Sequence, residues 1–371
     1  MKRVAIIAGM RTPFVRAGTH FKELGPLKLG VHSVKGLLEK TQIDPGIIEA
    51  MAYGVVVPEA GKPNLAREIV FETGIPSSIE AQTISSYCIT GLRTLSAISD
   101  AIALGRIDVG IAGGVDSFSH ADMDIFIEPT TGLSMGQHME LTAKVWNIAR
   151  EDQDKIALAS HENAIRAKEK LSQEISPLLG INHDTGPRSD TSLAILAGLK
   201  PVFDQNGTLT AGNSSPVTDG ASSVLLMSEE RARSEGLDVL AFIRSFEYGA
   251  VDPEDGLLMA PAVTVPNILE KNALTLADIE LVEIHEAFGA QVLANIRALE
   301  KGFRGNPTGP FDMDRVNVSG SSVAIGHPWS ATGGRILTTL AYEMARRDVK
   351  HGLISICAAG AMAGAVLLER N

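Results

Sequence analysis

The chain has 371 residues, enough for two or three domains at roughly 100–200 residues each, and its 44% hydrophobic and 21% charged residues are typical of a globular protein. Its formal net charge of −11 at pH 7 argues against a general role in binding nucleic acids or anionic membranes. With only two cysteines, Cys88 and Cys357, the chain has neither a disulfide scaffold nor a cysteine-rich zinc site.

The first elements predicted along the chain are a strand at 4–8, a helix at 27–38 and a second strand at about 52–57. Lys2 and Arg3 before an apolar run are also typical of a signal peptide, but the run is short and no small-residue cleavage site follows it. We therefore expect a buried first strand and a protein of the cytoplasm or an equivalent compartment.

The next predicted unit is a strand, a helix and a parallel strand. An extended run at 81–86 leads into a turn at 88–91, and a buried apolar strand follows at 109–115. Between the turn and the second strand, apolar residues recur at helical spacing, namely Leu92, Leu95, Ile98 and Ile102. Gly105 follows them and is expected to end the helix.

A similar unit is predicted near the C-terminus. Extended runs at 315–318 and 322–325 precede a Gly-His-Pro turn at 326–328, and a buried strand follows the helix at 353–357. The apolar face of the predicted helix consists of Ile336, Leu337, Leu340 and Met344. The two units therefore have the same plan.

Cys88 and His327 occupy corresponding turns of these two units, which indicates an internal duplication. Further strands are predicted at 220–227, 239–244 and 279–284, and a further helix at 266–272. The fold class predicted from these elements is α/β, with two halves of one architecture.

A polar, mostly helical segment at 120–206 separates the two halves, and we expect it to pack on the surface of the first half. The predicted domains are therefore 1–119 plus 207–235, the inserted segment, and 236–371. The longest uncharged stretch, 352–368, is shorter than the roughly 20 residues that a membrane helix needs. We interpret it as buried strand and loop and expect no membrane span.

Cys88 and His327 are the first candidates for chemistry. Cys88 lies where a strand leads into a helix, and a helix N-terminus lowers the pKa of a thiol and can hold an oxyanion. A small buried hydrophobe is an equally good interpretation of Cys88 taken alone. The Gly-His-Pro turn constrains the ring of His327 as a base requires, although a turn histidine is by itself more often not catalytic.

Cys357 and His285 also lie at strand ends. Cys357 enters a run of Ala and Gly at 358–361, whose small side chains let a ligand approach the backbone N–H groups, although a packing turn is the alternative. His285 and Glu286 follow an apolar strand, at the edge where ligands bind in α/β sheets. The other interpretation is a helix start with Glu286 in its first turn, and we expect both to hold at once.

Taken together, the motifs make the chain resemble the thiolases, the acetyl-CoA C-acyltransferase family, over essentially its whole length. The matching stretches, in chain order, lie at 11–14, 85–91, 132–136 with 160–161, 210–221, 285–288, 317–334 and 357–360. His-Glu-Ala-Phe at 285–288 and Cys-Ala-Ala-Gly at 357–360 resemble the branch that contains the β-subunits of fatty-acid oxidation complexes. Tyr87, Trp329, Ala361 and a short middle segment depart from the pattern.

The resemblance implies a duplicated fold with αβαβα layers and an inserted loop domain at 120–206. It also implies a homodimer or homotetramer, and the branch implies a possible hydratase/dehydrogenase partner subunit. The implied activity is the thiolytic cleavage of a 3-oxoacyl-CoA by CoA, with the reverse Claisen condensation. CoA is then a substrate, and no resident cofactor or metal is expected.

The resemblance assigns a role to each candidate residue. Cys88 attacks the 3-keto carbon, His327 takes its proton, and Cys357 protonates the departing enolate. One oxyanion site would use the N–H of Cys88 with that of Ala359 or Gly360, and the other would use the His327 ring with either His285 or a water that His285 holds. Neither site requires a metal ion.

Alternative functions remain open at this point. They are a biosynthetic acetoacetyl-CoA thiolase, a condensing enzyme of the β-ketoacyl synthase type, and a non-catalytic acyl-CoA-binding subunit. The second cysteine favours a thiolase over a synthase, and the presence of Cys88 and His327 argues against the non-catalytic subunit. Ligands for the CoA phosphates cannot be selected from the basic residues of the middle segment, Lys144, Lys155, Arg166, Lys168, Lys170, Arg188 and Lys200.

Overall fold

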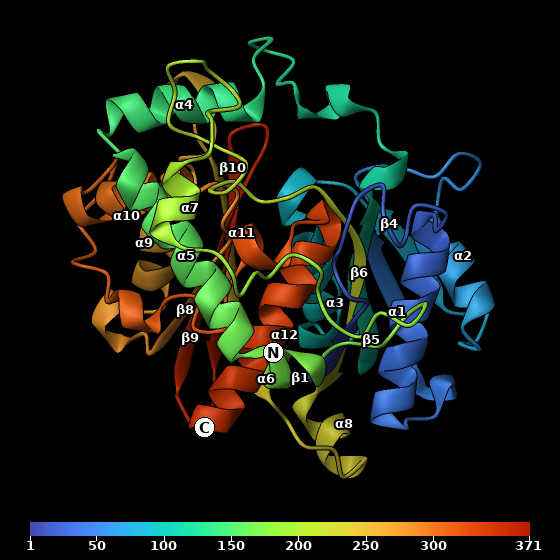
Figure 1. The fold of residues 1–371 in the computed structure, drawn as a ribbon. Helices are drawn as coiled ribbons and strands as arrows, with labels where there is room; N and C mark the ends of the chain where they lie inside the picture. Colours follow the sequence, from blue (N-terminus) through green and yellow to red (C-terminus); the bar gives the residue numbers. More distant parts are fainter.

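The computed structural model describes the backbone of residues 1–371 and every side chain except that of Met123. In this described part, ten strands form one hydrogen-bonded sheet in the order β4-β3-β5-β6-β1-β7-β10-β9-β8, with β2 beside β6 (Figure 1). The strands are β1 (Val4–Arg11), β2 (Val15–Arg16), β3 (Ala50–Gly54), β4 (Glu80–Ile84), β5 (Val109–Ser117), β6 (Thr218–Ser228), β7 (Ala241–Ala250), β8 (Leu281–Ile284), β9 (His351–Ala358) and β10 (Met362–Glu369).

The α-helices connect these strands and cover them. They are α1 (Pro26–Thr41), α2 (Leu65–Glu72), α3 (Thr90–Ala103), α4 (Met135–Val145), α5 (Arg150–Arg166), α6 (Lys168–Ser172), α7 (Leu193–Ala197), α8 (Glu229–Ser234), α9 (Pro261–Lys271), α10 (Gly289–Lys301), α11 (Ser322–Ile325) and α12 (Trp329–Arg347). Among the described helices, none is long and apolar enough to cross a membrane. The uncharged stretch at 352–368 forms most of the β9–β10 hairpin.

The order and direction of the strands confirm the predicted duplication. Outward from the junction of β1 and β7, one half of the sheet runs β1, β6, β5 and β3, and the other runs β7, β10, β9 and β8. In each half the first three strands pair antiparallel and the last pair is parallel. The general rules for connecting strands in α/β proteins do not by themselves require two halves to share both strand order and strand direction over four strands.

Two helices lie between the halves. Helices α3 and α12 contact each other, and α12 contacts β5 and β6 of one half as well as β8 and β9 of the other, as Figure 1 shows at the centre of the molecule. Helices α1 and α2 cover the N-terminal half, and α9 covers β7, β9 and β10. These are the predicted αβαβα layers. Because every residue of β5 and β9 is buried, both strands are mostly apolar and show no alternation of polar and apolar residues.

One predicted element is wrong. The run 322–325 was expected to be extended, but it forms the short helix α11, and 315–318 contributes only a single bridge between Val316 and Val282. The parallel partner of β9 is β8 instead. Gly320 and Gly326, with φ of 77° and 112°, bound α11 on either side. A short apolar run between glycines cannot be assigned to strand or helix by periodicity, because it is too short to display a period.

The middle segment also packs differently from the expectation. Its long helix α5 contacts α10 and α11, and α4 contacts α10, so these helices lie on the C-terminal half rather than the first half. The end of α5 and α6 also contact the N-terminal half, because Ala164, Ala167 and Leu171 share an apolar cluster with Phe14. After α6, Arg11 forms buried ion pairs with Glu174 and Asp184 at 3.0 and 2.6 Å. The ion pairs explain why β1 ends on an arginine. The domain boundaries themselves stay a prediction.

Candidate active site

Cys88 lies in a tight turn between β4 and α3. A short 3₁₀ helix, η2 (Tyr87–Ile89), joins the two elements, and the N–H of Ser86 donates to Thr90 Oγ1 at 2.7 Å to close the turn. Tyr87 adopts a left-handed conformation with φ of 48°, which is uncommon for a residue other than glycine. The strained turn directs the buried Cys88 side chain to the N-terminal end of α3.

His327 precedes α12 in the same way, and its backbone N–H donates to Thr218 Oγ1 at 2.9 Å. Its imidazole has a contact at each ring nitrogen. Nδ1 lies 2.7 Å from Thr332 Oγ1, and Nε2 lies 3.1 Å from Cys88 Sγ. When Nδ1–H donates to Thr332, the lone pair of Nε2 faces the thiol. This orientation is the one that a general base for Cys88 needs.

Two backbone N–H groups favour the charged form of the sulfur. Those of Ala359 and of Cys88 itself both act to lower the pKa of Cys88. The N–H of Gly360 has a different partner, because it donates to Glu128 Oε2 at 3.3 Å. Of the two alternatives predicted for the second oxyanion donor, Ala359 is therefore the one whose N–H faces the reacting sulfur.

His285 completes the cluster from the end of β8. Its Nδ1 lies 2.8 Å from Ser322 Oγ, which also accepts a hydrogen bond from Arg335 Nη2 at 3.2 Å. Its Nε2 is buried and has no hydrogen-bond partner among the described residues. One ring nitrogen each of His285 and His327 and the sulfur of Cys88 all lie within 4.8 Å of one another, and the two ring centroids are 4.0 Å apart.

The alternative interpretation of this segment as a helix start is wrong. Helix α10 begins only at Gly289, so Glu286 lies before its first turn. The Glu286 carboxylate instead accepts hydrogen bonds from Ser160 Oγ at 2.6 Å and from Asn317 Nδ2 at 2.7 Å. It therefore connects α5 of the middle segment to the strand end that carries His285.

Burial determines the protonation states. It lowers the pKa of His285 to about 3, with a further contribution from Arg335, and it lowers the pKa of His327 well below its ordinary value. Burial also raises the pKa of Cys88 to about 12, despite the opposing N–H groups of Ala359 and Cys88. The sequence-based expectation of a lowered pKa for Cys88 is thus wrong. The resting site contains a neutral thiol and two neutral imidazoles.

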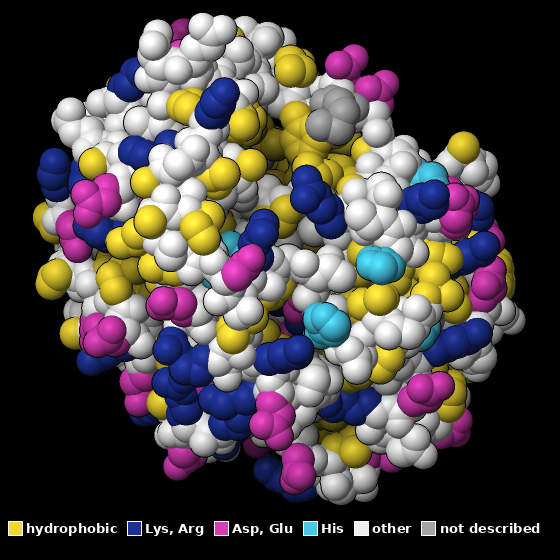
Figure 2. Space-filling model, viewed as in Figure 1, with side chains coloured by type: hydrophobic (Ala, Val, Ile, Leu, Met, Phe, Trp, Pro, Cys, Tyr) yellow, Lys and Arg dark blue, Asp and Glu magenta, His cyan; other side chains and the backbone are white. Residues whose placement is uncertain are grey.

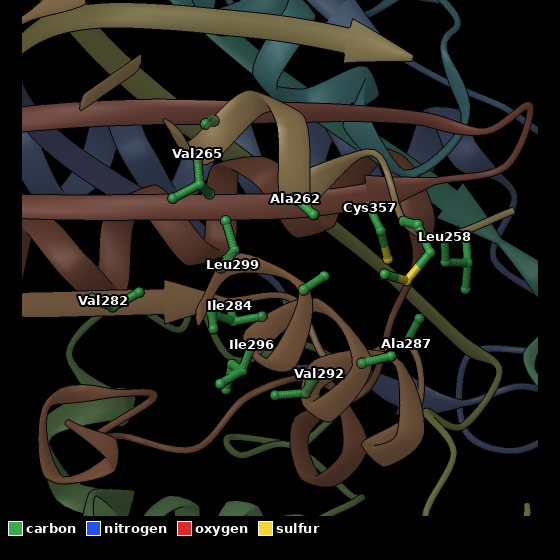
Figure 3. Close-up of a cluster of buried hydrophobic side chains, with 14 of the residues drawn as sticks. Leu258, Ala262, Val265, Val282, Ile284, Ala287, Val292, Ile296, Leu299 and Cys357 are labelled. Carbon is green, nitrogen blue, oxygen red and sulfur yellow. The ribbon is translucent and has the colours of Figure 1, made fainter. Parts of the chain in front are cut away.

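Cys357 lies at the end of β9, at the margin of the apolar cluster that β8, α9 and α10 form. Figure 3 shows its sulfur close to Leu258 and near Ala287. Burial raises the pKa of Cys357 well above its ordinary value, and the nearby Cys88 raises it further. Cys357 therefore keeps its proton until a strong base forms beside it, as an acid for a carbanion must.

Alkylation should distinguish the two thiols. With a limiting amount of iodoacetamide, Cys88 is expected to react before Cys357, because His327 Nε2 can accept its proton and the side chain is slightly more exposed. The rate should rise with pH well beyond the neutral range, since a pKa of about 12 leaves little thiolate below it. Peptide mass spectrometry measures the order. Earlier labelling of Cys357 would contradict the assignment of Cys88 as the nucleophile.

Several residues of the site escaped sequence reasoning. Thr332 and Ser322 contact the two imidazoles, Thr218 accepts from the backbone N–H of His327, and Arg335 donates to Ser322. All four residues are buried. Thr332, Ser322 and Arg335 lie in or next to the stretch around His327 that resembles the thiolases. Arg335 interrupts an otherwise apolar helix face, and this could have indicated a buried polar role. Glu128 had none, because its loop has no recognisable motif.

The basic residues of the middle segment are mostly engaged with acids. Lys144 pairs with Asp204 at 3.1 Å, and Lys155 pairs with Glu151 and Asp152 at 3.0 and 3.2 Å. Figure 2 shows the same interspersion of Lys and Arg with Asp and Glu over this face of the molecule. The charges therefore single out no ligand for the CoA phosphates.

Comparison with known proteins finds similarity along the whole chain. Residues 4–230 match the thiolase N-terminal domain and residues 237–370 match the thiolase C-terminal domain. The chain is 38% identical over 422 residues to 3-ketoacyl-CoA thiolase of Pseudoalteromonas atlantica, with 99% of this chain and 97% of the relative covered. The corresponding values for 3-ketoacyl-CoA thiolase of Aeromonas salmonicida are 39% over 425 residues, 99% and 97%.

Solved structures are likewise similar over the whole length of the chain. Acetyl-CoA acetyltransferase of Bacillus anthracis superposes with a TM-score of 0.92 at 31% identity, and human mitochondrial 3-ketoacyl-CoA thiolase with 0.92 at 28%. Each comparison covers 100% of this chain and 99% of the other. The alignments with the bacterial relatives exceed the 371 residues of this chain, so those relatives contain residues that have no counterpart here.

Proposed function

The chain belongs to the thiolase family, and we propose that it is a 3-ketoacyl-CoA thiolase, an acyltransferase that cleaves a 3-ketoacyl-CoA with CoA to acetyl-CoA and a shortened acyl-CoA. The same residues catalyse the reverse Claisen condensation. The observation that carries this proposal is the 3.1 Å contact of Cys88 Sγ with His327 Nε2, beside the unpartnered His285 Nε2 in a buried pocket.

Acylation of Cys88 begins from neutral groups. As Cys88 Sγ attacks the 3-keto carbon, its proton passes to His327 Nε2, so that no isolated thiolate forms in the buried pocket. The N–H groups of Cys88 and Ala359 then stabilise the new oxyanion, since both already point at the sulfur. His327 becomes an imidazolium with Thr332 at its other nitrogen.

Cleavage of the C–C bond follows. Acetyl-CoA leaves as an enolate, whose oxygen is stabilised by His327 and by the Nε2–H of His285. Cys357 donates its proton to the enolate carbon and becomes a thiolate. The thiolate of Cys357 then takes the proton of the incoming CoA thiol, which attacks the acyl group on Cys88. Cys88 leaves as a thiolate and recovers its proton from His327, so that every group returns to its starting state.

A biosynthetic acetoacetyl-CoA thiolase is the second candidate, favoured by the similarity to the Bacillus anthracis acetyl-CoA acetyltransferase. Steady-state thiolysis against 3-ketoacyl-CoA chain length, with acetoacetyl-CoA as the shortest substrate, separates the two. A kcat/KM that rises with chain length supports the degradative enzyme, whereas activity confined to acetoacetyl-CoA supports the biosynthetic one. No thiolysis of any chain length would contradict both. A non-catalytic subunit is disfavoured by the intact Cys88–His327 contact.

CoA is a substrate of this mechanism, which needs neither a metal nor a resident cofactor because protein groups supply each acid, base and oxyanion donor. A cytoplasmic location and a hydratase/dehydrogenase partner subunit remain part of the proposal through the resemblance to the β-subunit branch. Both His285 and the Ala-Ala-Gly loop at 358–360 belong to that resemblance.

A homodimer or homotetramer is expected in solution. Strand β4 is an edge of the sheet, paired only with β3 in the described chain, and it ends a few residues before Cys88. A second copy of the chain could cover this edge and the turn that carries Cys88 together. It would then pair the free N–H and C=O groups of β4 and rigidify the site. Light scattering measures the mass. A stable and fully active monomer of 39.3 kDa would contradict this prediction.

Glu128 is expected to act as a positioning residue for the oxyanion loop. Its buried carboxylate holds the N–H of Gly360, next to the Ala359 N–H that faces Cys88. Glu128→Ala should lower kcat, with KM little changed, by less than the roughly 10²-fold that follows loss of a whole oxyanion donor. Glu128→Gln keeps an acceptor oxygen and should recover much of the rate. Equal rates in the wild type and the alanine variant would exclude the role.

A further inference from the structure

Cys88, His285 and His327 form a set of possible metal ligands that their spacing in the sequence does not predict. They come from three separate segments of the chain, and the fold brings one ligand atom of each within 4.8 Å of the others. All three side chains are buried. We propose that, in the free enzyme, this cluster binds a thiophilic divalent cation, foremost Zn²⁺, which reversibly blocks the active site.

The ligand chemistry selects the class of cation. One thiolate and two imidazoles are preferred by Zn²⁺, whereas Mg²⁺ and Ca²⁺ prefer oxygen ligands. Three protein ligands leave one tetrahedral position for water. The described residues offer no comparable set of oxygen ligands around Cys88, so hard cations are not expected to bind in this position.

The groups around the ligands are arranged as in a metal site. Thr332 holds Nδ1 of His327 and Ser322 holds Nδ1 of His285, so that both Nε2 atoms are left for the centre of the cluster. Such outer contacts to the second ring nitrogen orient metal-binding histidines in general. His285 Nε2 in addition is a buried polar atom without a partner in the described structure, and a cation bound there would satisfy it.

The binding step is balanced without any co-reactant. Zn²⁺ displaces the thiol proton of Cys88 to solvent and forms one Zn–S bond and two Zn–N bonds, and no electron is transferred. Both imidazoles are neutral, and neither loses a proton to solvent. The proton of His285 moves from Nε2 to Nδ1 as the metal binds, and Ser322 Oγ, 2.8 Å from Nδ1, accepts a hydrogen bond from it there. The positive charge of Arg335 opposes the cation. Glu283 lies 3.8 Å from that guanidinium, but burial raises the pKa of its carboxyl to about 8, so it offsets this charge mainly above neutral pH.

The consequence is mutual exclusion between the metal and the acyl group. A sulfur that is bonded to Zn²⁺ cannot attack a substrate, and a sulfur that carries an acyl or alkyl group cannot bind the metal as a thiolate. Inhibition of the enzyme by Zn²⁺ depends on His285. An asparagine at this position would hold a water for the substrate but would not supply a nitrogen ligand for the metal.

The test measures metal binding directly. Metal-free wild-type protein is titrated with Co²⁺, whose bond to a thiolate gives an intense near-ultraviolet band, and Zn²⁺ is then added to displace the Co²⁺. The expected result is one Co²⁺ per chain, displaced by Zn²⁺ and not by Mg²⁺. Protein alkylated at Cys88 and the Cys88→Ser variant should lack the band. Conversely, Zn²⁺ should protect Cys88 from iodoacetamide.

Two variants complete the experiment. His285→Asn should weaken Zn²⁺ binding by at least the roughly 10–100-fold that follows loss of an outer-shell contact. His351→Asn removes another buried histidine, at the opposite end of β9 from Cys357, and should bind Zn²⁺ as the wild type does. Unchanged affinity in His285→Asn, or a thiolate band in Cys88→Ser, would overturn the proposal. Thiolysis assayed with a chelator tests the proposed function separately, so the two failures are distinguishable.

Discussion

The Cys357→Ala variant is expected to lose C–C bond cleavage and condensation by roughly 10²–10⁴-fold, the usual effect of removing a catalytic acid or base. Transfer of an acyl group from acyl-CoA to Cys88 should persist, because it requires no acid for a carbon atom. The physical reason is that Cys357 is a buried thiol with a raised pKa close to Cys88, and it therefore holds a proton where the enolate carbon forms.

Two measurements on the same preparation check this result. Mass spectrometry follows acylation of Cys88 in the absence of CoA, and steady-state assays follow cleavage of a 3-ketoacyl-CoA. Val265→Ala is the matched control, because Val265 belongs to the same apolar cluster and lies away from Cys357 (Figure 3). It should lower the thermal midpoint and leave kcat near the wild-type value. Equal losses in both half-reactions of Cys357→Ala would remove the assigned role.

The His285→Ala variant is expected to lower kcat for cleavage by about 10²–10³-fold, the usual effect of removing one oxyanion donor. The Ser322 hydroxyl accepts from Arg335 and can donate to His285 Nδ1, which leaves a proton on Nε2 for the thioester oxygen. Acylation of Cys88 should change little, because it uses the N–H groups of Cys88 and Ala359. His285→Asn should recover part of the loss through a bound water.

Thermal midpoint and kcat must be measured on the same samples of these variants. A purely structural role of His285 predicts a lower thermal midpoint with near-normal turnover per folded enzyme. That outcome would contradict the oxyanion role. The pH profile is a second readout. Because the pKa of His285 is lowered to about 3, the ring is neutral throughout the working range and should contribute no inflection above that value.

Local patterns in the sequence were sufficient for the elements that carry the chemistry. Helix α3 begins at Thr90, two residues after Cys88, as the spacing of Leu92 and Leu95 predicts. The ordered motifs identified the family, which the domain matches over 4–230 and 237–370 bear out. The duplicated plan was also visible, because two similar turns precede two similar apolar helices.

Other features depended on contacts that local patterns do not encode. The run 322–325 was predicted as extended and is α11, since three apolar residues in so short a run satisfy either pattern. Helices α4 and α5 lie on the C-terminal half because α10 and α11 offer them a surface, and no signal within the middle segment specifies that surface. Glu128 reaches Gly360 across 232 positions of the chain.

The sequence by itself thus determined the family, the duplicated α/β architecture and the candidate nucleophile and base. Only the tertiary structure decided their protonation states and mutual distances. The position of Cys88 at a helix N-terminus predicts a lowered pKa, but burial by distant segments raises it to about 12. The contact between Cys88 and His327 joins residues 239 positions apart, and His285 reaches them from a third segment. Such distances arise from the packing of whole layers, so no local property of the chain encodes them.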